Sequence, residues 1–220
     1  MIYIAPSILA ADYAALGEDV RKVPNADLIH VDIMDGHFVP NLSFGPDVTK
    51  AVNGVTEQFL DMHLMIEQPE RWFETYAQAG GDRMVFHVEA TGDHIAAAKQ
   101  CRGLGVQSGF AVKPGTPIEP YLGDLEHFDE VMVMSVEPGF GGQKFMPEVL
   151  SKVMLLRDAI REQGLDTIIG IDGGIANATI AQAAEAGVDA FVAGSAVFGA
   201  DDPAAAVERL RQLAQEAAGN

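Results

Sequence analysis

The sequence predicts a protein of the α/β class, a (β/α)8 TIM barrel that forms a single domain over residues 1–220. Short apolar and β-branched runs alternate with helical patterns, and eight such pairs follow one another without a low-complexity linker. The length of 220 residues suits a barrel at the compact end of its size range. A doubly wound open sheet is the alternative, but the turn after the first strand lacks the glycine-rich pattern usual there.

The expected elements are bounded by turn residues and by helix-capping residues. The strands are Tyr3–Ser7, Leu28–Ile33, Gln58–Leu64, Arg83–Val88, Gln107–Val112, Glu130–Ser135, Thr167–Ile171 and Ala190–Ala193. The helices that follow them are Tyr13–Lys22, Asp47–Val52, Pro69–Ala79, Asp93–Arg102, Pro117–Leu122, Pro147–Gln163, Asn177–Ala186 and Pro203–Ala217. Asp93 is placed to cap the fourth helix, and Pro147 and Pro203 suit first-turn positions. Gly164 and Gly187 stand where helices are expected to end.

The chain is strongly acidic, with 14 basic and 32 acidic residues and a formal net charge of −18. This charge would repel nucleic acid and anionic membranes. No apolar run reaches the roughly 18 residues of a membrane-spanning helix. The single cysteine, Cys101, forms no internal disulfide, which fits a reducing compartment. We therefore expect a cytoplasmic protein that binds neither nucleic acid nor membrane.

Four side chains suited to a divalent metal fall at the expected C-terminal ends of three strands: His30, Asp32, His63 and Asp172. Residues i and i+2 of a strand share a face, so His30 and Asp32 point the same way. In this fold, functional groups gather where the strands end. Two imidazoles and two carboxylates suit one ion of Zn²⁺, Fe²⁺, Mn²⁺ or Co²⁺. Each residue alone is compatible with a packing role, whereas four on one rim favour a metal centre.

Glycine-rich segments follow the last three expected strands and are candidates to hold a phosphate. Glycine lets backbone N–H groups approach an anion closely, and the loops after strands seven and eight often bind phosphate in this fold. The phosphate candidates are Gly173, Gly174, Gly194 and Ser195. The segment Gly139–Gln143 is long enough to act as a lid that excludes water. The alternative is that these glycines only form tight turns.

Other residues at the expected strand ends are also candidates for a functional role, and several of them are equally compatible with a structural one. Three methionines either fill the barrel adaptably or form an apolar wall around a reactive intermediate: Met34, Met65 and Met134. Ser7 either binds substrate or caps a turn. Lys113 is able in principle to form a Schiff base, although an open turn follows it. His87 ends the fourth strand and is a candidate to support the metal ligands.

Together these segments resemble the ribulose-phosphate 3-epimerase family over nearly the whole chain, most specifically at His30–Asn41 and Met134–Gln143. The resemblance implies a homo-oligomer, dimeric or hexameric, that interconverts D-ribulose 5-phosphate and D-xylulose 5-phosphate in the pentose phosphate pathway and the Calvin cycle. It implies that all four metal candidates bind the ion and that Asp32 and Asp172 are also the acid/base pair. Positions that match substrate and phosphate contacts are Ser7, His63, Gly139, Gly141, Gly142, Asp172, Gly173, Gly174, Gly194 and Ser195.

The implied chemistry is removal of the C3 proton beside the C2 ketone, which gives an enediolate, and return of a proton to the opposite face. Two alternatives remain: a 3-epimerase of a six-carbon ketose phosphate such as allulose 6-phosphate, and a non-catalytic sugar-phosphate-binding barrel. Asp32 and Asp172 argue against the second, because binding a phosphate needs neither. A related superfamily of decarboxylases uses an Asp-x-Lys-x-x-Asp motif, and the segment from Asp32 to Asp35 lacks its lysine.

Overall fold

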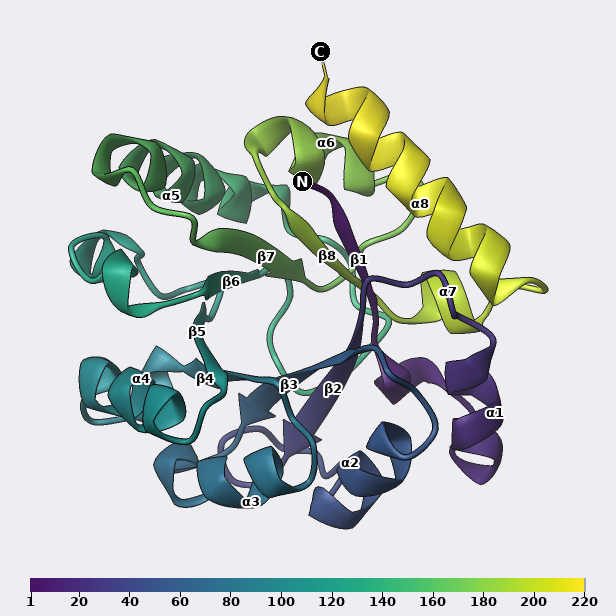
Figure 1. Cartoon of the computed structure of the whole chain (residues 1–220). Helices are drawn as coiled ribbons and strands as arrows, with labels where there is room; N and C mark the ends of the chain where they lie inside the picture. Colours follow the sequence, from purple (N-terminus) through teal and green to yellow (C-terminus); the bar gives the residue numbers. More distant parts are fainter. Residues whose placement is uncertain (220) are drawn as a thin grey trace.

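A nearly closed barrel of eight parallel strands forms the centre of the computed structural model, which describes residues 1–219 (Figure 1). The strands are β1 Tyr3–Pro6, β2 Leu28–Met34, β3 Phe59–Met65, β4 Arg83–His87, β5 Gln107–Val112, β6 Glu130–Met134, β7 Ile168–Asp172 and β8 Ala190–Ala193. Spatial order follows chain order from β2 to β8, and β1 pairs with β8. Between β1 and β2 the barrel closes through an isolated bridge of Ser7 and His30. The predicted (β/α)8 barrel is confirmed.

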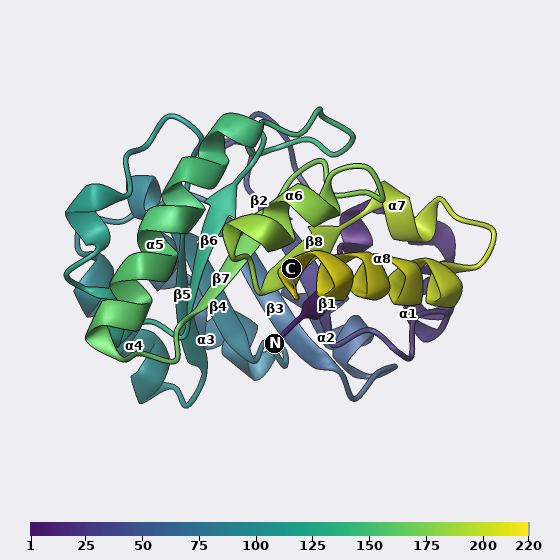
Figure 2. The ribbon, with the colours of Figure 1, turned by 90° about the horizontal axis from the view of Figure 1, so that it is seen from above.

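Helices surround the strands on the outside of the barrel (Figures 1 and 2). They are α1 Leu16–Arg21, α2 Pro46–Asn53, α3 Phe73–Gln78, α4 His94–Gly103, α5 Leu150–Gln163, α6 Ile180–Ala186, α7 Ser195–Phe198 and α8 Pro203–Ala218. Within the described residues, every helix is too short or too polar to cross a membrane.

Several helices differ from the sequence prediction. Segments expected to begin as α-helix are 3-10 turns instead: Tyr13–Ala15, Pro69–Arg71 and Pro147–Val149. The helix expected over Pro117–Leu122 is wrong, because the segment forms only a 3-10 turn at Glu119–Tyr121. Its two prolines, Pro117 and Pro120, lack the N–H groups that a helix this short requires. Helix α7 was not predicted; it follows β8 with only Gly194 between them.

The expected helix caps at Asp93, Pro203, Gly164 and Gly187 are present. The Asp93 carboxylate accepts from the Ala96 N–H at the start of α4, and Pro203 is the first residue of α8. Gly164 and Gly187 end α5 and α6 with φ of +65° and +108°. Glycine adopts this left-handed conformation without the steric cost that a side chain adds.

Alternation along the strands separates two buried layers. Outward residues such as Val31 and Ile33 pack with helix residues such as Leu156 in one large apolar cluster. Inward residues such as Val85 and Met132 form a smaller cluster inside the barrel. Because residues i and i+2 share a face, the alternation of β2 and β3 directs their polar side chains into the barrel.

The barrel interior also holds a buried charged network below the strand ends. Nε of Arg83 lies 2.8 Å from Oδ1 of Asp61, and Nη2 of Arg83 lies 2.8 Å from Oε2 of Glu130. A Cβ atom at Gly170 would clash with Oε1 of Glu130. Glycine in the middle of β7 therefore makes room for a buried carboxylate.

Candidate metal centre and active site

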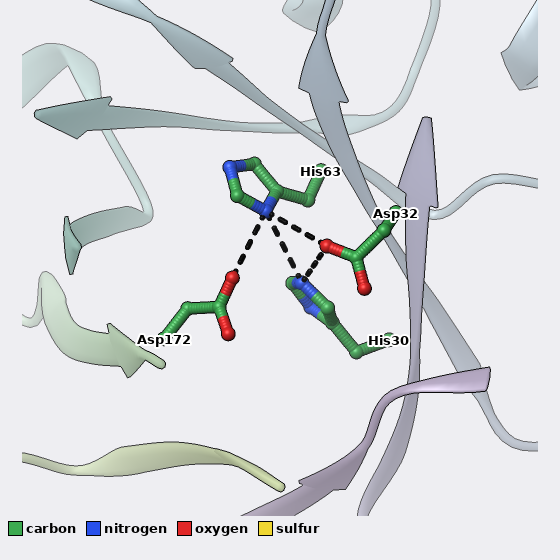
Figure 3. Close-up of side chains that lie close together, drawn as sticks. All are labelled: His30, Asp32, His63 and Asp172. Carbon is green, nitrogen blue, oxygen red and sulfur yellow. Dashed lines mark hydrogen bonds and ion pairs between the residues drawn. The ribbon is translucent and has the colours of Figure 1, made fainter. Parts of the chain in front are cut away.

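The four predicted metal ligands converge at one point inside the barrel (Figure 3). His30 and Asp32 come from β2, His63 comes from the neighbouring β3, and Asp172 ends β7. Each residue offers one ligand atom, and all four atoms lie within 4.8 Å of one another. In the register of the sheet, Asp32 stands beside His63.

The separations between these atoms fit a single small divalent ion. Nδ1 of His63 lies 3.2 Å from Oδ1 of Asp32 and 3.3 Å from Oδ2 of Asp172. Nε2 of His30 lies 3.4 Å from both Nδ1 of His63 and Oδ1 of Asp32. Two donors held about 2.1 Å from one ion at a tetrahedral angle stand about 3.4 Å apart. The donor set of two nitrogens and two oxygens suits the ions that the sequence predicted.

The electrostatics of the cluster favour a positive charge at its centre. Burial lowers the pKa of His63, but hydrogen bonds to Asp172 and Asp32 outweigh burial and raise it. Burial raises the pKa of Asp32, but His30 and His63 outweigh burial and lower it. The same carboxylates that attract a proton to an imidazole attract a cation, so protons and metal compete here.

A carboxylate holds the far side of His30. Nδ1 of His30 lies 2.8 Å from Oδ2 of Asp61, and Arg83 binds the other oxygen of Asp61. A carboxylate behind a ligating histidine fixes the ring and is typical of metal sites. Asp61 had no predicted role, although its position two residues before His63 places both on one strand face.

His87 contacts the other histidine candidate, His63, as expected of a supporting residue. Its Nε2 lies 3.0 Å from Nε2 of His63, and its Nδ1 lies 3.1 Å from Oε2 of Glu89. Burial lowers the pKa of His87 to about 4. Lys113, the other candidate from the strand ends, places its ammonium 4.0 Å from the centroid of the Phe38 ring, a cation–π contact.

A cavity of about 450 Å³ opens beside the metal candidates, at the C-terminal ends of the strands. It is lined by the predicted substrate contacts other than His63, and by the predicted methionines: Ser7, Gly139, Gly141, Gly142, Asp172, Gly173, Gly174, Gly194, Ser195, Met34, Met65 and Met134. Asp32 also lines the cavity, whereas His63 is fully buried. Phe140, from the predicted lid segment, lines it too. Leu9 and Ile175 also line it and were not predicted, because an isolated apolar residue carries no chemical signal.

Ser7 caps a turn and also donates a hydrogen bond to Asp32. Its hydroxyl accepts from the Leu9 N–H, which caps a 3-10 turn, and donates to Oδ2 of Asp32 at 2.5 Å. Ser43, which the sequence analysis missed, donates its hydroxyl to the Asp32 carbonyl. Asp32 is therefore fixed at both its side chain and its backbone.

The glycines after β7 are required by the turn itself. Gly173 and Gly174 have φ of +120° and +63°, and a Cβ at Gly174 would lie 2.6 Å from the Phe145 nitrogen. The turn therefore requires glycine at both positions, and the backbone of both also lines the cavity. The loop after β6 lines the cavity and is tied to the segment after β2, because Asn41 donates its amide to the Gly139 carbonyl at 2.7 Å.

A second hollow of about 460 Å³ lies at the opposite mouth of the barrel. It is lined by residues at which strands begin, among them Tyr3, Leu28, Phe59 and Gln107. This hollow is not the candidate active site, because the metal candidates lie at the other ends of the strands.

Comparison with known proteins identifies the family of this chain. The model of the "Ribulose-phosphate 3 epimerase family" matches residues 3–198. The chain belongs to the ribulose-phosphate 3-epimerase family. Proteins named ribulose-phosphate 3-epimerase are similar to it: that of Mycobacterium bovis is 57% identical over 96% of this chain and 92% of its own length. That of Bacillus subtilis is 42% identical over 96% of this chain and 99% of its own length. The chain is an enzyme of this kind.

Solved structures with low sequence identity share the fold alone. KGPDC from Streptococcus mutans superposes with a TM-score of 0.75 at 14% identity, over 98% of each chain. A 3-hexulose-6-phosphate synthase superposes with a TM-score of 0.66 at 22% identity, over 96% of this chain and 99% of its own.

Proposed function

We propose that the protein catalyses the reversible epimerisation of D-ribulose 5-phosphate to D-xylulose 5-phosphate at C3, through a 2,3-enediolate. One observation carries the proposal: two carboxylates, Asp32 and Asp172, approach the same nitrogen of His63 at the wall of the cavity. Inversion at C3 needs a proton carrier on each face of the sugar, and two facing carboxylates supply that pair. The family names of the relatives support the five-carbon substrate.

The two carboxylates differ in ways that suit acid/base work. Asp32 accepts the Ser7 hydroxyl and is 3% exposed, so its position is fixed. The Asp172 side chain is 16% exposed and lines the cavity. In the proposed reaction one carboxylate removes the C3 proton and the other returns a proton to the opposite face. The roles exchange when the reaction runs in reverse.

A divalent ion is part of the proposal, held by His30, Asp32, His63 and Asp172. When bound, it would supply Lewis-acid stabilisation of the negative charge that develops on the substrate oxygens. His30 and His63 are fully buried and the neighbouring residues hold their rings, so the protein fixes the ligands before an ion arrives.

Backbone N–H groups are proposed to hold the phosphate, at Gly173, Gly174, Gly194 and Ser195. They border the same cavity as the two carboxylates, and Ser195 begins α7. The first N–H groups of a helix have no partner within the helix and favour an anion. Ser7, Gly139, Gly141 and Gly142 complete the proposed substrate contacts, with Met34, Met65 and Met134 as the apolar wall.

Proton NMR of D-ribulose 5-phosphate in D₂O tests this function directly, with metal-replete protein and with chelator-stripped protein. We expect xylulose 5-phosphate carrying deuterium at C3, formed only in the metal-replete sample. Product without deuterium at C3 would contradict the two-base mechanism, and equal rates after stripping would contradict the metal. Allulose 6-phosphate serves as the comparison substrate, because faster turnover of the six-carbon sugar would contradict the pentose assignment.

We also propose a cytoplasmic homo-oligomer, a dimer or a hexamer, that acts in the pentose phosphate pathway or the Calvin cycle. A free, buried Cys101 supports a reducing compartment. The homo-oligomer is proposed from the family resemblance alone. Light scattering on the purified protein measures the mass, and a monomer would contradict the assembly.

A further inference from the structure

The hydrogen bonds behind His63 continue through two more residues to the edge of the barrel. Nε2 of His63 lies 3.0 Å from Nε2 of His87, and Nδ1 of His87 lies 3.1 Å from Oε2 of Glu89. Both rings are fully buried and stack with centroids 5.1 Å apart. The Glu89 side chain is 21% exposed, so the chain of contacts ends in a carboxylate near solvent.

The other oxygen of Glu89 is already occupied. Oε1 accepts from the backbone N–H of Lys113 at 2.8 Å and from the hydroxyl of Thr116. Burial raises the pKa of Glu89, but hydrogen bonds from His87, Thr116 and Lys113 outweigh burial and lower it to about 2. An ionised carboxylate only accepts hydrogen bonds, so Glu89 presents a fixed acceptor to Nδ1 of His87.

The proton positions along this chain are linked. With Glu89 as acceptor, Nδ1 of His87 carries a proton, and Nε2 of a neutral His87 carries a lone pair. Two nitrogens 3.0 Å apart need one proton between them, so Nε2 of His63 donates. In neutral His63, the form that binds a metal, Nδ1 then keeps its lone pair, and this is the atom that faces Asp32 and Asp172 (Figure 3).

We propose that Glu89 is a positioning residue that acts through His87 to set the tautomer of His63, so that Nδ1 is presented to a divalent cation. The inference rests on the metal centre of the proposed function. His30 is set directly by Asp61, whereas His63 is set by a carboxylate one imidazole further away. Each histidine ligand thus has a carboxylate that selects its ligating nitrogen.

Glu89→Gln separates this role from simple packing, because it preserves the shape of the side chain. Lys113 and Thr116 both need an acceptor, so the amide oxygen stays with them and the NH₂ group turns to His87. That group donates to Nδ1 of His87, which moves the His87 proton to Nε2 and the His63 proton to Nδ1. A cation then has to displace a proton, and we expect Zn²⁺ affinity to fall roughly tenfold.

The measurement is Zn²⁺ affinity by competition with a chromophoric chelator, with Thr116→Val as the matched control. That control removes one donor to Glu89 but leaves the carboxylate against His87, so we expect wild-type affinity. Unchanged affinity in Glu89→Gln, or an equal loss in Thr116→Val, would overturn the proposal.

Nitrogen-15 NMR of histidine-labelled, Zn²⁺-loaded wild-type protein gives a second readout that needs no variant. We expect the proton on Nδ1 of His87 and on Nε2 of His63. A proton on Nε2 of His87 would overturn the inference even if Glu89→Gln does not fold. Wild-type protein that binds no Zn²⁺ would instead contradict the proposed metal centre, and with it this inference.

Discussion

Hydrogen bonds from neighbouring residues fix the position of Asp32 more firmly than that of Asp172. Asp32 carries one hydrogen bond from Ser7, and its backbone carbonyl carries another from Ser43. Asp172 lines the cavity and approaches His63 from the other side of the barrel. The two acids therefore have the same chemistry and different freedom, which makes substitutions at Asp172 the clearer test of acid/base function.

Asp172→Asn should keep the fold and lose turnover by roughly 10²–10⁴-fold, because it removes one proton carrier. It should also weaken metal binding, since an amide is a poorer ligand than a carboxylate. Steady-state rates with ribulose 5-phosphate, measured at saturating metal, check the first effect. Circular dichroism shows whether the fold persists, and a folded variant with wild-type rates would rule out the two-base proposal.

Ser195→Ala should mainly raise KM, with little change in kcat. Its proposed contact with the phosphate is similar in the ground and transition states, so its loss weakens binding uniformly. Initial rates over a range of substrate concentrations separate the two parameters. An unchanged KM would remove the Ser195 hydroxyl from the site.

At the scale of elements, a cap and a buried stripe explain the longest helix, α8. Helix α8 begins with Pro203, and its buried residues Val207, Leu210 and Ala214 recur at helical spacing. The carboxylate of Asp202 accepts from the Ala205 N–H at 3.0 Å. By contrast, the segment around Pro117 and Pro120 has neither the length nor the N–H groups to continue beyond a 3-10 turn.

Asp202→Ala should lower the free energy of unfolding by about 1 kcal/mol, the usual cost of a lost N-cap. Asp201→Ala is the matched control, since it removes the same charge from the neighbouring position. Urea titrations of both variants and the wild type measure the difference. A loss as large in Asp201→Ala would assign the effect to charge and not to the cap.

At the scale of the whole molecule, the barrel interior buries two carboxylates around one arginine. Asp61 and Glu130 share Arg83, and His30 also contacts Asp61. Burial raises the pKa of Glu130 to about 7, with Arg83 opposing that rise and Asp61 adding to it. Glu130 thus holds a proton in the folded protein over a pH range in which the unfolded chain has lost it.

This shift predicts a pH-dependent stability. Because the folded pKa lies above the ordinary value, stability falls as pH rises from about 4.5 to about 7 and is flat above that. Glu130→Gln removes this dependence, so the wild type should lose on the order of 1–3 kcal/mol relative to the variant across that range. Urea unfolding of both proteins at several pH values measures it, and parallel curves would show that Glu130 does not titrate there.

The sequence by itself determined the local structure and the residue types available for catalysis and metal binding. The strands, the face shared by His30 and Asp32, and the glycines that end α5 and α6 all follow from periodicity and backbone conformation, which are local properties. The family could also be recognised from the sequence, because its most specific motifs, His30–Asn41 and Met134–Gln143, are continuous segments.

The tertiary structure decided which distant residues meet. The register of β2 against β3 sets Asp32 beside His63. Closure of the barrel brings Asp172 to Nδ1 of His63, the nitrogen that Asp32 also approaches. The support of His63 by His87 and Glu89 arises in the same way, since these contacts join β3, β4 and the loop that follows. Local patterns nominated His87 and the four ligand candidates, but the atoms that meet and their distances depend on the packing of the whole chain.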